Sequence, residues 1–135
     1  MENKKIITSG KRKTSVARVV LKEGTGVIKI NNKNYIHLHF FDKLKIEEPL
    51  KIAECVLGKP NFDIMISVKG GGEKSQIESA RLALARAMLK FSNSEELKNA
   101  FLQYDRTLLV ADVRRKEMYK PGDSKARRKR QKSYR

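Results

Sequence analysis

Lysine and arginine side chains crowd the last 22 residues of the chain, and their chemistry is that of phosphate binding. This segment, residues 114–135, has a net charge of +9, because eleven cations face only two acids. Each cation that neutralises a phosphate releases a condensed counterion, so such a segment binds polyanions with a strongly salt-dependent affinity. The cations that we predict to contact a nucleic-acid backbone are Arg114, Arg115, Lys116, Lys120, Lys125, Arg127, Arg128, Lys129 and Arg130.

A second basic cluster lies near the N-terminus. Seven cations and no acid occur between Asn3 and Lys22, and residues 1–113 as a whole carry 20 cations and 13 acids, a net charge of +7. Basic clusters at both ends of a more balanced middle are typical of a folded module with nucleic-acid-binding arms. We therefore predict RNA contacts from Lys11, Arg12, Lys13 and Arg18, with an ordinary solvated charge run as the alternative.

Three consecutive glycines, Gly70, Gly71 and Gly72, form the third candidate site. They separate a predicted strand from a predicted helix, and the free N–H groups and positive dipole at a helix N-terminus suit a phosphate. A nucleotide-binding P-loop is disfavoured because Glu73 interrupts the glycine-lysine-serine order. Two readings stay open, a tight turn that needs positive φ and a contact with a nucleic-acid phosphate. Lys74 is included among the predicted RNA contacts.

Metal and nucleophile chemistry have weak support in the sequence. His37, His39 and Cys55 lack a fourth ligand at suitable spacing, so no metal and no cofactor are predicted. A nucleophile set of Cys55, His37 and Asp42 is formally available, but nothing in the sequence brings these residues together. The lone cysteine excludes an internal disulfide, and we expect it to be a small buried hydrophobic residue.

Length and composition predict one folded unit with an appended tail. The chain has 135 residues, of which 39% are hydrophobic, which suits a globular RNA-binding domain over residues 1–113 and an extended tail over residues 114–135 that is ordered on RNA. No apolar run approaches the roughly 20 residues that a membrane span needs. We expect a soluble, cytoplasmic protein with no membrane partner.

Hydrophobic periodicity predicts an α+β two-layer fold. The predicted strands cover residues 13–22, 27–30, 62–68 and 107–113. One helix is expected to begin at Pro49, in its first turn, and to end at Gly58; a longer one covers residues 73–91 and is buried on two sides. Ser92 and Glu95 suggest a capping box for a shorter helix that ends near Tyr104. The sum is a four-stranded, mostly antiparallel sheet with helices on one face.

Three separated motifs resemble one known family. They are Ser9-Gly10-Lys11-Arg12-Lys13-Thr14-Ser15-Val16-Ala17-Arg18-Val19, then Lys69-Gly70-Gly71-Gly72 with Gln76 and Ala83-Leu84-Ala85-Arg86-Ala87, then Asp112, Arg114-Arg115-Lys116-Glu117 and Lys125-Ala126-Arg127. In this order they resemble the ribosomal protein S-nine family of the small subunit. The ending Gln131-Lys132-Ser133-Tyr134-Arg135 is similar to the archaeal and eukaryotic branch, which commonly has proline where this chain has Val113.

The resemblance implies a fold, a location and partners. It implies a left-handed β-α-β crossover, as in the second domain of ribosomal protein S-five, and a place in the head of the small subunit. There the family binds the 3′ domain of the small-subunit rRNA among neighbouring head proteins. It also implies that the tail reaches peptidyl-site tRNA, with Arg135 near the anticodon stem-loop and Lys132 and Tyr134 as neighbours. Tyr134 would stack on a base or ribose, or would simply be a tail aromatic.

The leading hypothesis is a non-catalytic ribosomal component, and two alternatives stay open. The first alternative is the protein subunit of an RNA-processing ribonuclease, which shares the size and charge but needs a catalytic RNA or clustered acids for Mg²⁺. The second is a DNA-packaging protein, which would bind DNA and ribosomal RNA equally well. Detection of RNA cleavage would favour the first alternative, and a marked RNA preference would count against the second.

Overall fold

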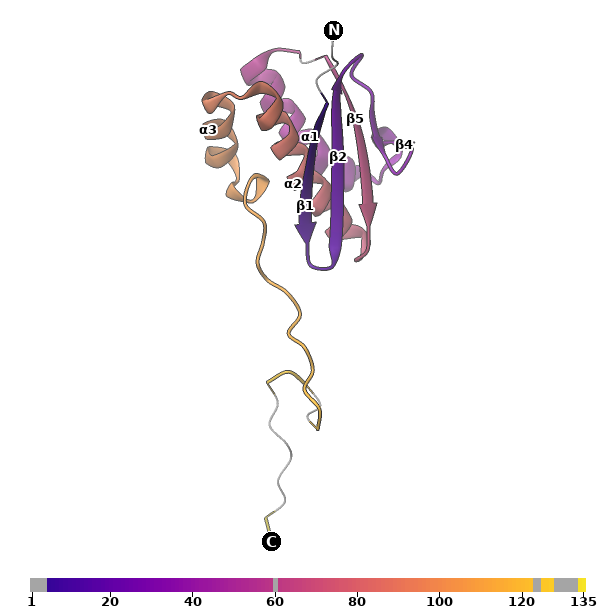
Figure 1. Ribbon diagram of the computed structural model, residues 1–135, viewed down its shortest axis with the longest axis vertical. Helices are drawn as coiled ribbons and strands as arrows, with labels where there is room; N and C mark the ends of the chain where they lie inside the picture. The colour runs from indigo at the N-terminus through magenta and orange to yellow at the C-terminus, as the bar shows by residue number, and fades with distance from the viewer. Residues whose placement is uncertain (1–4, 60, 123–124, 128–133) are drawn as a thin grey trace.

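A mixed β-sheet with helices on one side forms the body of the protein (Figure 1). The computed structural model describes residues 5–59, 61–122, 125–127 and 134–135. The strands within those ranges are β1 (Ile6–Arg12), β2 (Ser15–Glu23), β3 (Ile28–Ile30), β4 (Lys33–Asn34) and β5 (Phe62–Lys69). The helices are α1 (Phe40–Leu57), α2 (Glu73–Ser92) and α3 (Glu95–Tyr104), with short 3-10 turns η1 (Tyr35–His37) and η2 (Arg106–Leu108). No described helix has the length and apolar character that crossing a membrane requires.

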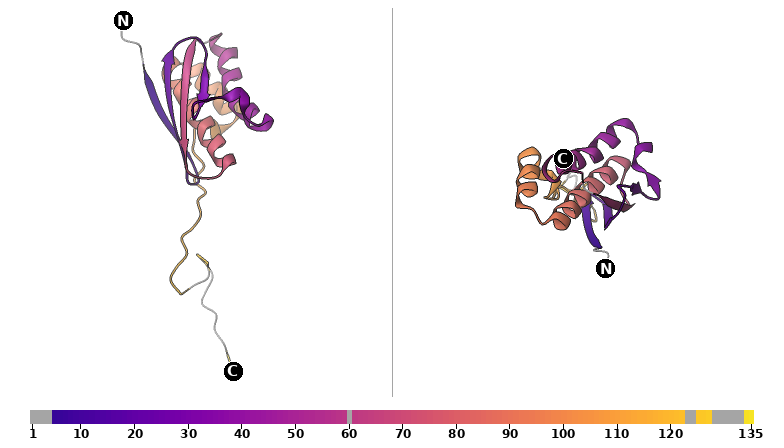
Figure 2. Two further views of the ribbon diagram at one scale, coloured as in Figure 1. Left: turned by 90° about the vertical axis from the view of Figure 1, so that its right-hand side faces the viewer. Right: turned by 90° about the horizontal axis from the view of Figure 1, so that it is seen from above.

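The sheet has the strand order β1-β2-β5-β3-β4. β1 pairs with β2, β2 with β5 and β3 with β4 in antiparallel fashion, whereas β3 and β5 are parallel and are joined through α1. The prediction of a two-layer α+β fold is confirmed at this level, and all three helices lie on one face (Figure 2). The prediction of four strands is wrong, because the described residues form five. The hand of the β3-α1-β5 crossover stays a prediction.

The predicted strands differ from the observed ones in two places, for identifiable reasons. Residues 107–113 contain no strand: Asp105 Oδ1 accepts a hydrogen bond from the Thr107 backbone N–H at 2.8 Å and caps the turn η2, after which the chain leaves the body. The strand β1 was not predicted, and Lys13, predicted to begin a strand, lies in the tight turn between β1 and β2 with φ of 53°. Its left-handed conformation is uncommon for a residue with a side chain.

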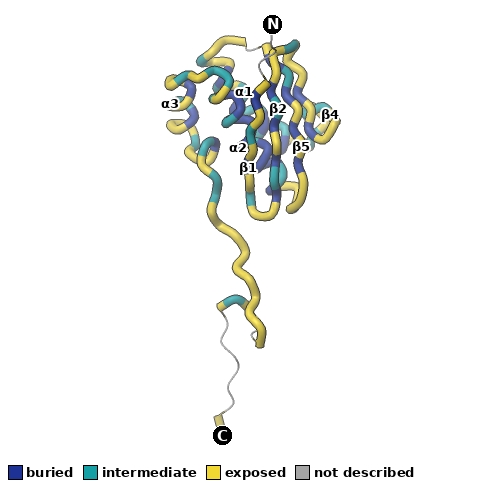
Figure 3. Tube along the Cα trace, viewed as in Figure 1, coloured by how far each residue is buried: buried dark blue, intermediate teal, exposed yellow. Residues whose placement is uncertain are grey.

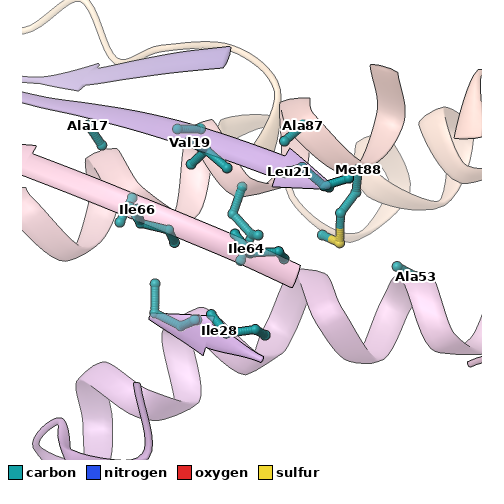
Figure 4. Packing of buried hydrophobic residues seen from close by; sticks show 14 of the residues in the cluster. Ala17, Val19, Leu21, Ile28, Ala53, Ile64, Ile66, Ala87 and Met88 are labelled. Atoms are coloured by element: carbon teal, nitrogen blue, oxygen red, sulfur yellow. The ribbon is translucent and has the colours of Figure 1, made fainter. Parts of the chain in front are cut away.

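The core lies between the sheet and the helices (Figure 4). Alternate residues of β2 and β5 point into it, including Val19, Leu21 and Ile64, each with no exposed surface. α2 is buried on both sides as predicted, since Leu84 and Leu82 are both buried although they lie on different faces of the helix. α3 begins after Ser94, whose hydroxyl accepts a hydrogen bond from Leu97 N, so Ser94 rather than Ser92 is the cap.

The helix α1 differs most from its prediction. It begins at Phe40, and Pro49 lies in its interior instead of its first turn. Proline removes one backbone hydrogen bond from a helix, but the ring of Pro49 is fully buried, and this burial offsets part of the loss. The end at Gly58, with φ of 77°, is as predicted. Cys55 is exposed, so the prediction that it is buried is wrong.

A glycine in β1 allows that strand to lie directly against α2. A Cβ atom on Gly10 would lie 2.5 Å from the carbonyl oxygen of Ser79 and 2.8 Å from the backbone nitrogen of Ala83. Beside it, the Thr8 hydroxyl donates to the Ala83 carbonyl oxygen at 2.8 Å. The backbones of β1 and α2 therefore touch with no room for a side chain.

Replacing Gly10 with serine should lower the free energy of unfolding by about 1–3 kcal/mol, the usual cost of overpacking a core. Gly72→Ser is the matched control, because a Cβ there meets no atom within 4 Å and serine is favoured at a helix N-cap. Urea denaturation of the two variants provides the measurement. Equal stability of Gly10→Ser and the unaltered protein would contradict the close contact.

Candidate nucleic-acid interface

A groove of cationic side chains lies where the tail leaves the body. Three elements meet there: the end of β1, the turn into β2 and the first tail residues. The groove is lined by Lys11, Lys13, Thr14, Val16, Arg114, Arg115 and Lys116. Of its cations, Lys11, Lys13, Arg115 and Lys116 make no ion pair with any residue in the described ranges. We call this feature the hairpin–tail groove, and it brings together five of the residues that the sequence predicts to bind RNA.

Arg12 lies apart from these free cations. Alternation along β1 turns it toward the helices, and its side chain is only 14% exposed. Its Nε donates to Glu78 Oε2 at 2.7 Å, and its Nη2 lies 3.2 Å from Asp112 Oδ2. Arg12 therefore joins β1, α2 and the root of the tail, and the prediction that it contacts RNA stays a prediction.

Asp112 fixes the conformation at the start of the tail. Its Oδ1 accepts a hydrogen bond from the Arg114 backbone N–H at 2.8 Å, and its Oδ2 pairs with Arg114 Nη2 at 2.7 Å. With Arg12 on its other side, this carboxylate holds the exposed Arg114 at the rim of the groove. The next residue, Val113, is exposed.

Two arginines of α2 that were not predicted as site residues hold the segment before the tail. Arg86 donates from Nε to the Leu109 carbonyl oxygen at 3.0 Å and from Nη1 to the Ser9 carbonyl oxygen at 3.1 Å. Arg81 Nη2 lies 2.6 Å from Glu48 Oε2 and 3.1 Å from Asp105 Oδ2. A signal existed in the sequence: arginines within an otherwise apolar helix segment need partners.

The triple-glycine turn lies at the same end of the sheet. Gly70 and Gly71 have φ of 75° and 70°, and a Cβ on Gly71 would lie 2.6 Å from Ser75 Oγ. The Ser75 hydroxyl accepts from Gly72 N at 3.0 Å and donates to Gly72 O at 2.8 Å, which closes the turn. The geometry supports the reading as a tight turn. Lys74 Nζ pairs with Asp42 Oδ1 at 2.9 Å, so part of its charge is already neutralised.

Comparison with known proteins identifies the family of this chain. A family model described as ribosomal protein S9/S16 matches residues 10–135, from Gly10 in β1 to the last residue. The chain belongs to this family. The resemblance noted from the sequence motifs is thereby confirmed.

Relatives within the S9 family match over nearly the full length. The protein described as small ribosomal subunit protein uS9 of Thermoplasma volcanium is 49% identical over 132 residues, which cover 96% of this chain and 98% of that protein. The protein of the same description from Methanococcus vannielii is 46% identical over 135 residues, 98% and 99% of the two chains. That of Desulfurococcus amylolyticus is 45% identical over 131 residues, 96% and 92% of the two chains.

The first part of the tail, which lies within the S9 family match, is exposed (Figure 3). Residues 113–122 contain no helix or strand, and each of them is exposed. Lys116 Nζ lies 4.7 Å above the Tyr119 ring, and Arg127 Nε donates to Glu117 Oε2 at 2.8 Å. Tyr134 and Arg135 are exposed. Four predicted contacts lie outside the described residues: Arg128, Lys129, Arg130 and Lys132.

Other side chains that were considered for chemistry are far apart. Cys55 lies in the last turn of α1 and His39 precedes its first residue, a separation of about 24 Å along a helix axis. Among the described residues, no group of three or more His, Cys, Asp or Glu side chains could hold a metal ion. Arg18 does not line the groove, although by strand alternation it shares the outer face of the sheet with Val16; it lines a separate hollow farther along β2.

Asp112 should remain ionised well into the acid range. Hydrogen bonds from the Arg114 side chain and backbone, with the charge of Arg12 nearby, hold the pKa of the Asp112 carboxyl well below its ordinary value. Since this pKa is lower in the folded than in the unfolded chain, the carboxylate contributes its full stabilisation above about pH 4, and the contribution is lost as pH falls through the folded-state pKa. The carboxyl-carbon NMR signal of Asp112 should therefore not shift between pH 7 and pH 4.

The Arg114→Gln variant tests the cause of this pKa. It removes the guanidinium and keeps the backbone donor, so the pH midpoint of the Asp112 NMR titration should move up toward the ordinary value for an aspartate. A midpoint near pH 4 in the unaltered protein would show that these contacts are absent in solution.

Proposed function

We propose that the chain is a non-catalytic component of the small ribosomal subunit that binds rRNA through its body and extends its tail to peptidyl-site tRNA. The observation that carries the proposal is the extent of the family match, which continues through the whole basic tail to residue 135. The relatives named above are described as small-subunit proteins. The proposed location is the head, on the 3′ domain of the rRNA, among neighbouring head proteins.

The proposed rRNA contacts begin at the hairpin–tail groove and continue along the tail. Unpaired cations on two chain segments that lie side by side can follow one phosphate backbone, and RNA helices are recognised mainly through phosphates, 2′-hydroxyls and shape. A second contact is proposed at the triple-glycine turn, because it precedes the N-terminus of α2, a helix of 20 residues, and a helix N-terminus favours a phosphate.

The tail lacks the apolar side chains to fold alone, so we propose that it becomes ordered on RNA. Among the described tail residues, Arg114 is held at the body by Asp112. The tail extends away from the body beyond this point (Figure 1), so Arg135 lies far from the groove. The proposed role of Arg135, with Lys132 and Tyr134, is to add positive charge beside the anticodon stem-loop of the bound tRNA. This role rests on membership of the family.

Sedimentation tests the proposal. In a lysate of the source organism the protein should travel with small subunits at low salt, and its retention should fall as salt rises. A protein that stays in the soluble fraction at low salt would contradict the proposal. Incubation of the purified protein with structured RNA and Mg²⁺ separates the ribonuclease alternative, because cleavage would count against a non-catalytic role.

A further inference from the structure

The second face of the sheet is not covered by any helix that the structure describes. All three helices lie on the other face (Figure 2). Side chains alternate along a strand, so every second residue of β1, β2 and β5 points to the uncovered face. Direct cross-strand pairs place Ile7 opposite Val20 and Val20 opposite Met65. The three form an apolar row across β1, β2 and β5, with Ile7 57% and Met65 52% exposed.

Unpaired cations flank this row on both sides. Arg18 and Lys22 precede and follow Val20 on β2, Lys29 lies next to Met65 in the register of β3 with β5, and Lys5 precedes β1. These four side chains line one shallow hollow with Met65, and none of them forms an ion pair with a described residue. We call this surface the outer sheet face.

The acid on this face is not available to neutralise these cations. Asp63 is opposite Lys22 in the register, but its Oδ1 accepts hydrogen bonds from the backbone N–H groups of Thr25, Gly26 and Val27 at 2.9, 3.1 and 3.0 Å. The carboxylate is therefore engaged by the loop that follows β2.

The helix layer differs from this face, because acids pair with several of its cations. Lys43 and Lys51 both pair with Glu47, Lys45 pairs with Glu78, and Lys74 pairs with Asp42. The body is thus electrically two-sided: acids neutralise part of the charge of the helix layer, and the excess positive charge lies on the sheet.

From this asymmetry we infer that the outer sheet face is a second RNA-binding surface, distinct from the hairpin–tail groove, on which a ribose-phosphate strand lies across β2 and β5. Arg18, Lys22 and Lys29 contact its phosphates, and the apolar row contacts sugar and base surfaces. The inference rests on the proposed function, since it names a further rRNA contact of the same protein.

Charge and size both favour RNA over a protein as the occupant. A stable protein interface buries about 800 Å² on each partner around an apolar centre depleted of charge, whereas here an apolar row three residues long is bordered by free cations. A polyanion neutralises those cations with release of counterions. The strands place no aromatic ring on this face, so bases have no aromatic side chain to stack on, and binding should depend little on sequence.

A triple substitution tests the inference. Arg18→Gln, Lys22→Gln and Lys29→Gln together remove three charges from the outer sheet face, and each phosphate contact contributes about 0.7–0.9 to the slope of log affinity against log salt. Binding to small-subunit rRNA transcribed in vitro should show a slope smaller in magnitude by about 2–3. The control removes three unpaired charges from the helix side, with Lys90→Gln, Lys98→Gln and Arg106→Gln, and should leave the slope unchanged.

If the salt slope falls equally in the two triple variants, the inference is overturned, because the change in net charge alone would then explain the effect. Lysine acetylation gives a second readout in assembled small subunits: Lys22 and Lys29 should be protected relative to the free protein. If the protein sediments with small subunits while both lysines stay reactive, the inference fails and the proposed function stands. Protection that survives ribonuclease digestion and cross-links to a protein would also overturn it, in favour of an acidic protein partner.

Discussion

Removing residues 125–135 should reduce the magnitude of the salt slope for rRNA binding by about 5–6. The deletion takes away seven cations, and each that neutralises a phosphate contributes about 0.7–0.9 to the slope. At 50 mM salt the affinity should fall by several orders of magnitude, because a protein with 6–10 phosphate contacts carries most of its binding energy in them. Filter binding over a range of salt concentrations provides the measurement.

The body should be unaffected by this deletion. The core residues all precede residue 109, and thermal unfolding of the truncated protein should therefore have the same midpoint as that of the full chain. An unchanged salt slope in the truncated protein would show that the tail is not an RNA-binding element.

Phe101→Ala should lower the free energy of unfolding and leave the salt slope for rRNA binding unchanged, the reverse of what we expect for the deletion. Phe101 is fully buried in α3, and truncation of a buried phenylalanine to alanine costs about 3–5 kcal/mol. That is a large share of the 5–15 kcal/mol that stabilises a typical domain. The measurement is the free energy of unfolding in urea. Under conditions in which the variant is still folded, its salt slope for rRNA should equal that of the unaltered protein.

Leu102→Ala is the matched control for this substitution. The side chain is next in the same helix but 40% exposed, and surface changes of this kind usually alter stability by less than about 0.5 kcal/mol. If Phe101→Ala and Leu102→Ala unfold at the same urea concentration, α3 does not pack on the body as described here.

The elements that the sequence predicted well are those whose burial pattern is local. β5 alternates without interruption from Phe62 to Val68, and α2 repeats its apolar residues at helical spacing, so one strand or one helix contains the whole signal. β1 was missed because its inward positions are Ile6, Thr8, Gly10 and Arg12. Only the first is a large apolar residue, and the reasons for the glycine and the arginine lie in α2, far along the chain.

In the candidate interface, too, some features could be predicted from local sequence and others depend on tertiary packing. Charge counting alone located the hairpin and tail cations, because an excess of positive charge needs no fold to be seen. It could not separate Lys11 and Lys13, which form no ion pair within the described part of the chain, from Arg12, which is held by Glu78 and Asp112. That distinction depends on strand alternation and on acids brought close by tertiary packing. For the same reason the outer sheet face became visible only once the register of β1, β2 and β5 was known.

The most direct test of the account is a cryo-electron microscopy structure of the small ribosomal subunit of the source organism with tRNA bound. The account predicts that phosphates lie within ion-pairing distance of Lys11, Lys13, Arg115 and Lys116, and that the tail follows RNA to the peptidyl-site tRNA. A structure in which these side chains and the tail extend into solvent, away from any nucleotide, would contradict it.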